Sequence, residues 1–142
     1  MSDESQFSQS FEVAGGDFLN AGKASTGIKA ILREIGINAS VIRRVAIAAY
    51  EAEMNVVLYA RKGVMTLQVA PTHVRIAVED EGEGIPNVEL AMQEGYSTAS
   101  DEVREMGFGA GMGLPNIKKN ADEFSISSVP GTGTTLDIVI GL

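Results

Sequence analysis

Glu51 and Asn55 stand four positions apart in an apolar stretch that runs from residues 41 to 62. The stretch contains almost no strong helix breaker and predicts a helix, on which residues four apart project from the same face. A carboxylate and an amide inside a mostly apolar stripe cost free energy to bury unless they are paired. Either they serve a site, or Glu51 pairs with a neighbour such as Arg44 and Asn55 satisfies a backbone group. Glu53 projects from nearly the opposite face and is expected to be solvated.

Asp80 closes a strand-like run, THVRIAVED, at residues 72–80. The apolar side chains of this run recur with period two, and the same phase makes Asp80 point inward. Gly82 and Gly84 follow, so an inward acceptor stands beside two residues without Cβ atoms, where a flat group could approach the backbone closely. Aspartate before glycine is also a common turn former, which is the alternative interpretation. The two glutamates between these residues are expected to stay solvated.

A glycine-rich run, GFGAGMG, occupies residues 107–113 and leads into a helix expected to begin near Leu114. Glycines leave their backbone N–H groups unobstructed, and a helix amino terminus carries partial positive charge, so the run could hold phosphate. A disordered tether would have a similar composition. The sequence has neither the P-loop motif nor a G-x-G-x-x-G motif after a strand.

Composition bounds the class of protein. With 142 residues and a mass of 15.0 kDa the chain fits one domain, and 44% hydrophobic residues with four prolines indicate a folded protein. The charge of −8 and the pI near 4.6 disfavour direct binding to nucleic acid or membranes. A polar, acidic amino terminus and the lack of cysteine suggest the cytoplasm. One histidine and no cysteine disfavour a serine-histidine triad or a transition-metal site.

The order of expected elements predicts an α/β two-layer sandwich, in which helices cover one face of a mixed, largely antiparallel sheet. Residues 64–80 and 124–140 each look like an antiparallel hairpin. Asp17 and Ser40 are the expected N-caps of the first two helices, and Gly36 is the expected end of the first. The strands are expected at 10–15, 64–70, 72–80, 124–129 and 134–140, and the helices at 17–36, 41–62, 87–95 and 114–124.

Four motifs in this order resemble the GHKL superfamily of ATPases, whose Bergerat fold is shared by gyrase, the heat-shock chaperone and sensor histidine kinases. They are helical Glu-x-x-x-Asn, strand-end Asp-x-Gly-x-Gly, a glycine-rich lid and a terminal hairpin with Gly-Thr. The phrases NVVLYA, EDEGEGIP, EGYSTAS and DEFSISSVPGTGTTL are similar to the small anti-sigma-factor serine kinases and switch kinases of bacterial stress complexes. The resemblance covers residues 10–140. The chain departs from the pattern at Tyr50, where members often have a small hydroxyl residue.

The resemblance implies an adenine site. Asp80 would accept a hydrogen bond from the adenine amino group, and Gly82 and Gly84 would give the base room. Thr134, in GTGTT, matches the threonine that supports the adenine contact.

The resemblance also implies a phosphate site. Asn55 would bind Mg²⁺ held against the phosphates of ATP, and Glu51 would be the general base. Mg²⁺ prefers few protein ligands together with phosphate oxygens, so one amide oxygen can suffice. The ATP lid would span residues 96–113. The glycines that match the lid and phosphate box are Gly107, Gly109, Gly111 and Gly113.

The function implied is that of an ATP-dependent protein-serine/threonine kinase in partner-switching regulation, with a STAS-domain antagonist as its substrate. The alternative is a binding module that uses nucleotide to set its shape and holds a sigma factor or a regulatory phosphatase. A homodimer is compatible with either. A sensor histidine kinase fits less well, because no helical hairpin with a phosphoacceptor histidine precedes the ATP module.

Overall fold

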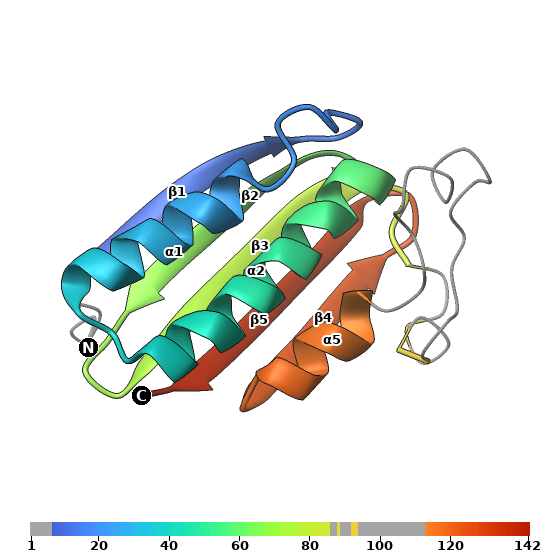
Figure 1. Ribbon diagram of the computed structural model, residues 1–142. Helices are drawn as coiled ribbons and strands as arrows, with labels where there is room; N and C mark the ends of the chain where they lie inside the picture. Colours follow the sequence, from blue (N-terminus) through green and yellow to red (C-terminus); the bar gives the residue numbers. More distant parts are fainter. Residues whose placement is uncertain (1–6, 86–87, 89–91, 94–112) are drawn as a thin grey trace.

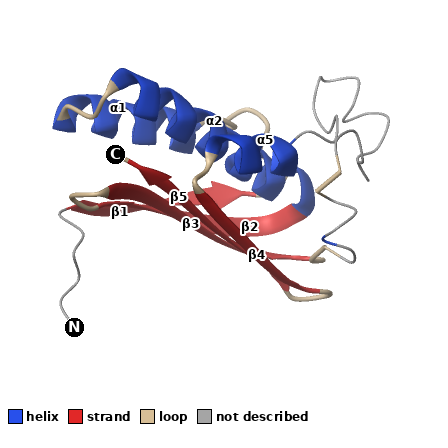
Figure 2. Cartoon of the chain, turned by 90° about the horizontal axis from the view of Figure 1, so that it is seen from below, coloured by secondary structure: helices blue, strands red, loops and turns tan. Residues whose placement is uncertain are grey.

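The computed structural model describes residues 7–85, 88, 92–93 and 113–142. In this part of the chain, three helices cover one face of a five-stranded sheet (Figures 1 and 2). The expected α/β two-layer architecture is thus confirmed. The elements are β1 (Phe7–Ala14), α1 (Lys23–Ile35), α2 (Ala39–Tyr59), β2 (Ala60–Val69), β3 (His73–Gly82), α5 (Gly113–Asn120), β4 (Glu123–Val129) and β5 (Gly133–Gly141).

The sheet has the strand order β1-β2-β3-β5-β4. Both expected hairpins, β2 with β3 and β4 with β5, are present. Each of the four pairings in the described part is antiparallel, so the sheet there is antiparallel and not mixed as expected. The last strand inserts between β3 and β4, so Glu79 of β3 pairs with Thr135 of β5. This pairing brings the end of β3 beside the beginning of β5, which is where two of the predicted site residues lie.

The core lies between the sheet and the helices. Along each strand, alternate side chains point toward the helices, as in β2, where Met65 and Leu67 are fully buried. In α1 the buried residues Ile28 and Leu32 recur at helical spacing. Helix α2 lies between α1 and α5 over the middle of the sheet (Figure 1), and its contact with both helices explains why it is apolar over most of its surface.

The first helix begins later than expected. Residues 17–22 form turns, and α1 begins at Lys23 with Gly22 as its N-cap, so Asp17 is not the cap. The carboxylate of Asp17 instead accepts hydrogen bonds from the backbone and side-chain nitrogens of Asn20, at 3.3 and 2.7 Å. Gly36 ends the helix as expected, with a left-handed φ of 92° that favours glycine.

The ends of the other helices also differ from expectation. The N-cap of α2 is Asn38, whose side chain accepts from the Ser40 backbone N–H at 2.8 Å, so Ser40 lies inside the helix. Helix α2 ends at Tyr59, because Ala60 pairs with β3 and Lys62 pairs with both β1 and β3. Helix α5 ends at Asn120, because the residues that follow it join the sheet.

Several predictions lie outside the described residues. They include most of the helix expected at 87–95 and the loop expected at 96–112. Within the described ranges, no helix is long and apolar enough to cross a membrane.

Candidate functional site

Asp80 lies near the end of β3 and points toward the helix side of the sheet, as the period-two pattern predicts. Its Oδ1 atom accepts a hydrogen bond from the backbone N–H of Thr134 at 3.0 Å. The carboxylate is half-buried, and burial raises its pKa above the ordinary value of 3.8, while the Thr134 N–H opposes that rise. The two residues predicted to bind adenine are therefore in direct contact.

Thr134 is buried near the start of β5, and its hydroxyl group belongs to a small hydrogen-bond network. Its Oγ1 lies 2.9 Å from the Oγ of Ser128 on β4, which in turn accepts from the Ile85 backbone N–H at 2.6 Å. The network thus joins β4, β5 and the segment after β3. Sequence reasoning did not select Ser128, although the inward phase of FSISSV carries on to it. It is the one functional neighbour that periodicity could have found.

Gly82 and Gly84 lie against the protein's own backbone. A Cβ atom at Gly82 would be 2.9 Å from the carbonyl oxygen of Tyr59, and one at Gly84 would be 2.6 Å from that of Val129. Gly84 also has a left-handed φ of 77°. Both positions therefore require glycine for the packing of the chain itself, quite apart from any base.

Glu51 and Asn55 lie on the same face of α2, half-buried, and that face meets the first residue of α5. A Cβ atom at Gly113 would be 3.4 Å from Asn55 Oδ1 and 3.6 Å from Glu51 Oε2. The last glycine of the predicted phosphate loop thus comes next to both helical oxygens. An amide oxygen and a carboxylate oxygen facing a residue without a side chain suit a hard cation with phosphate ligands. The residues present therefore fit Mg²⁺.

Glu51 is held by α5 rather than by the arginine considered as its alternative partner. Asn116 donates a hydrogen bond from Nδ2 to Glu51 Oε2 at 3.2 Å. The guanidinium of Arg44 instead donates to the carbonyl oxygen of Asn120 at 3.0 Å and to Asp122 at 3.1 Å. Asn116 was not predicted, because nothing in the sequence indicates which face of α5 meets α2.

Glu53 is buried, which corrects the prediction that it is solvated. Its side chain does point away from Glu51, but that side of α2 meets α1, and Glu53 is only 2% exposed. Its carboxylate accepts three backbone N–H groups at the start of α1: Gly22 at 2.9 Å, Ala24 at 3.2 Å and Ser25 at 2.9 Å. Glu53 thus does the capping that was assigned to Asp17, and it complements the positive end of the helix.

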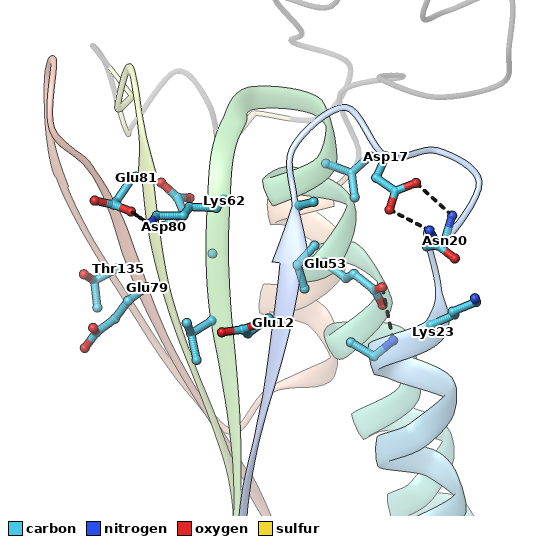
Figure 3. Close-up of a pocket in the computed structure, with 16 residues that line it drawn as sticks. Glu12, Asp17, Asn20, Lys23, Glu53, Lys62, Glu79, Asp80, Glu81 and Thr135 are labelled. Carbon is cyan, nitrogen blue, oxygen red and sulfur yellow. Dashed lines mark hydrogen bonds and ion pairs between the residues drawn. The ribbon is translucent and has the colours of Figure 1, made fainter.

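A hollow near the β1 edge of the sheet is not the predicted nucleotide site. It is lined by sixteen residues, including Asp80, but by none of Glu51, Asn55, Gly113 and Thr134 (Figure 3). Six of its lining side chains are carboxylates and two are lysines, a balance that would repel a triphosphate. The hollow and the candidate site share only Asp80.

The described part of the candidate site therefore has two ends. Asp80, Gly82, Gly84 and Thr134 form a strand-built end, and Glu51, Asn55 and Gly113 form a helix-built end. The other predicted lid glycines, Gly107, Gly109 and Gly111, lie outside the described residues.

Comparison with known proteins defines the class. Residues 19–140 match the histidine kinase-like ATPase domain. The chain belongs to this family, and its use of ATP follows from that membership. The GHKL-type fold and the class expected from the sequence are confirmed.

Named relatives place the chain within a narrower branch. It is 35% identical to serine/threonine-protein kinase RsbT of Bacillus subtilis (strain 168), over 77% of this chain and 79% of the relative. It is 32% identical to the anti-sigma F factor of Caldanaerobacter subterraneus subsp. tengcongensis, over 81% of this chain and 80% of the relative. The expected relation to serine/threonine kinases and anti-sigma factors is thereby confirmed.

Two solved structures share the fold. One contains the RsbU and RsbW domains of Rv1364c from Mycobacterium tuberculosis, with a TM-score of 0.61 and 18% identity. It matches 93% of this chain, which spans about a third (32%) of that longer chain. The other is the SiaB–SiaC complex from Pseudomonas aeruginosa, with a TM-score of 0.65, 14% identity, and 93% and 88% of the two chains covered.

Proposed function

We propose that this protein is an ATP-dependent protein-serine/threonine kinase that transfers the γ-phosphoryl group of ATP to a hydroxyl group of a partner protein. The observation that carries the proposal is the convergence of Glu51, Asn55 and Gly113 from two helices, next to the start of α5. Asp80 and Thr134 supply a separate acceptor at the ends of two adjacent strands.

At the strand-built end, Asp80 is proposed to accept a hydrogen bond from the adenine amino group. The Thr134 N–H fixes the orientation of its carboxylate by occupying Oδ1. Among the described residues, Oδ2 of Asp80 makes no hydrogen bond to the protein and is available for adenine. Gly82 and Gly84 let the chain beyond Asp80 pack closely on the backbone of Tyr59 and Val129, and they are proposed to leave room for the base.

At the helix-built end, Asn55 would hold Mg²⁺, which neutralises charge on the phosphate oxygens. Backbone N–H groups of Gly107, Gly109, Gly111 and Gly113 are proposed to hold the phosphates. Phosphoryl transfer requires positioning and charge neutralisation more than covalent assistance from the enzyme.

Glu51 is proposed to orient and deprotonate the attacking hydroxyl. In the transfer, a bond forms between the hydroxyl oxygen and the γ-phosphorus, the bond from that phosphorus to the bridging oxygen breaks, and ADP leaves. The proton of the hydroxyl passes to the Glu51 carboxylate. Asn116 holds one oxygen of Glu51 through its amide, so the other oxygen can face the acceptor.

The partner is proposed to be a STAS-domain antagonist, with a sigma factor or a regulatory phosphatase as the other member of the switch. The names of the relatives support this assignment, since two kinds of relative are a serine/threonine-protein kinase and an anti-sigma F factor. A structure with the same fold is of a two-protein complex, SiaB–SiaC.

The test is phosphoryl transfer from radiolabelled Mg-ATP to each purified STAS-domain protein encoded by the same genome. The native chain should label one of them, and Glu51→Ala should lower the rate by about 10²- to 10⁴-fold, as loss of a general base does. Glu34→Ala, at an exposed position on α1, is the matched control and should transfer at the native rate. Stable complex formation without label would instead identify a non-catalytic binding module.

A further inference from the structure

The outward surface of the helix layer is basic although the chain as a whole is acidic. The three described helices carry seven lysines and arginines and three glutamates. Of the glutamates, Glu53 is buried and Glu51 belongs to the candidate site, which leaves Glu34 as the only exposed carboxylate on these helices. This charge distribution contrasts with the net charge of −8. The cations are Lys23, Lys29, Arg33, Arg43, Arg44, Lys118 and Lys119, of which Arg44 is paired with Asp122.

A ridge of exposed residues, two of them largely apolar, runs through this basic surface. Arg43, Ile47 and Tyr50 recur at helical spacing along the outer side of α2, and we call them the α2 ridge. Ile47 is 38% exposed and Tyr50 39% exposed. The ring of Tyr50 also borders the start of α1, since its Cε1 atom lies 3.7 Å from where a Cβ of Gly22 would be. The ridge thus combines an aromatic residue, an aliphatic residue and an arginine.

The α2 ridge is continuous with the helix-built end of the candidate site. Tyr50 directly precedes Glu51, and adjacent residues on a helix differ by about 100° in direction. A body seated on the ridge would therefore have its edge over Glu51. Exposed Lys23 directly follows Gly22, which Tyr50 borders, and the exposed Lys118 and Lys119 lie on α5 just beyond Asn116. A macromolecule bound here could present a hydroxyl group to Glu51 while it contacts the α2 ridge and these lysines.

We propose that the α2 ridge docks the phosphoacceptor protein, through an apolar contact on Ile47 and Tyr50 and an acidic rim on the partner that faces the surrounding cations. This inference rests on the proposed kinase function. Apolar centres with charged rims, rich in tyrosine and arginine, are typical of protein interfaces. Nucleic acid would bring phosphate charge without an apolar contact, so it fits the centre of the ridge poorly.

The experiment measures binding and transfer separately, with the STAS-domain protein that the native chain labels or binds as the probe. The variants are Ile47→Ala with Tyr50→Ala, and Arg43→Glu. Calorimetry of the complex should show at least about tenfold weaker partner binding for each variant, the loss expected when central tyrosine and arginine contacts are removed. The Kd for Mg-ATP should stay within about twofold of native. In transfer assays the KM for the partner should rise while kcat at saturation changes little.

Two controls match the changes elsewhere. Val64→Ala truncates an apolar residue that is 41% exposed on the sheet face away from the helices, and Arg61→Glu reverses an exposed charge on β2. Both should bind the partner as the native chain does. Equal loss in controls and ridge variants, or native binding by the ridge variants, would overturn the proposal.

The remaining outcomes separate the two proposals. A complex that the ridge variants weaken but that carries no phosphate would retain the docking surface and remove the kinase function. If the ridge variants transferred phosphate with the native KM for the partner, the kinase function would be retained and the docking surface would be removed. Weakened self-association of the ridge variants in sedimentation, with partner binding unchanged, would assign the ridge to a second copy of this chain and overturn the inference.

Discussion

At the strand-built end of the candidate site, Asp80 receives its hydrogen bond from the backbone of the neighbouring strand, whereas at the helix-built end Glu51 receives one from the side chain of Asn116. The first contact is fixed by the pairing of β3 with β5, which continues over many residues. The second depends on how α5 packs against α2. The strand-built end is therefore set by the sheet, and the helix-built end by the relative position of two helices.

Among the changes that separate the two ends, the largest effect is expected from filling the space between the two helices. Gly113→Val places a branched side chain in front of Asn55 Oδ1 and Glu51 Oε2, where even a Cβ would be within 3.6 Å of each oxygen. Transfer should fall by about a hundredfold, the size of effect that misplacement at a reacting centre produces. Binding of adenosine, measured by calorimetry, should be unchanged because Asp80 is not disturbed. A parallel loss of adenosine binding would show that the two ends are not independent.

A smaller effect is expected at the strand-built end. Asp80→Asn keeps an oxygen for the Thr134 N–H but loses the charge, so adenine affinity should fall by about tenfold, as for one hydrogen bond to a charged group. Mg-GTP titrated in parallel should bind weakly to both proteins. Native affinity for Mg-ATP in the variant would remove Asp80 from the adenine site.

The same variant has an expected signature in stability. Because burial raises the pKa of Asp80, the folded state holds this proton more tightly than the unfolded chain, and Asp80 favours folding as the pH falls through the raised pKa. Above that pKa the charged form costs stability. At pH 7 the denaturant concentration at the midpoint of unfolding should therefore be the same for Asp80→Asn as for the native protein, or higher. The stability of the variant should also depend less on pH above 3.8. A loss of stability at pH 7 would contradict this account.

The smallest effect is expected for Asn116→Ala, which leaves Glu51 in place but frees its Oε2. The kcat for transfer should fall severalfold, because one hydrogen bond that orients the Glu51 carboxylate is lost while the carboxylate itself remains, and KM values for ATP and partner should stay native. Asn116→Ser, which can still donate, should restore part of the rate. A raised KM for ATP with native kcat would assign Asn116 to nucleotide binding instead.

The layout of the fold could be predicted from sequence because it depends on periodicity. The alternation of apolar residues along 72–80 predicted that Asp80 points to the helix side of the sheet. The spacing of four predicted that Glu51 and Asn55 share a face of one helix. Both are found in the structure. Helix ends were less predictable, since they depend on partners distant in sequence. The start of α1 is capped by Glu53, 28 positions beyond Ser25, and no local signal marks that pairing.

Within the site, the residues that reach between elements were missed. Ser128 contacts Thr134 from another strand, and Asn116 contacts Glu51 from another helix. Periodicity indicates that Ser128 points inward, but which residue each of them contacts follows only from tertiary packing. The prediction that Glu53 is solvated was wrong for the same reason. Glu53 does project from the side of α2 opposite Glu51, but α1 packs against that side and buries it. The adenine, metal and base roles themselves stay predictions until the variants above are measured.

The junction of α2 with β2 has a mechanical consequence. Helix α2 ends at Tyr59 and β2 begins at Ala60, with no connecting residue. The backbone N–H groups of Gly15 and Gly16 clamp this junction by donating to Arg61 and Val57, each at 2.8 Å. The carboxyl end of the helix is therefore fixed to the sheet, and α2 also packs against α1 and α5. Asn55 lies about one turn, or about 6 Å, before this junction, so its height relative to the strands is set by the same two hydrogen bonds.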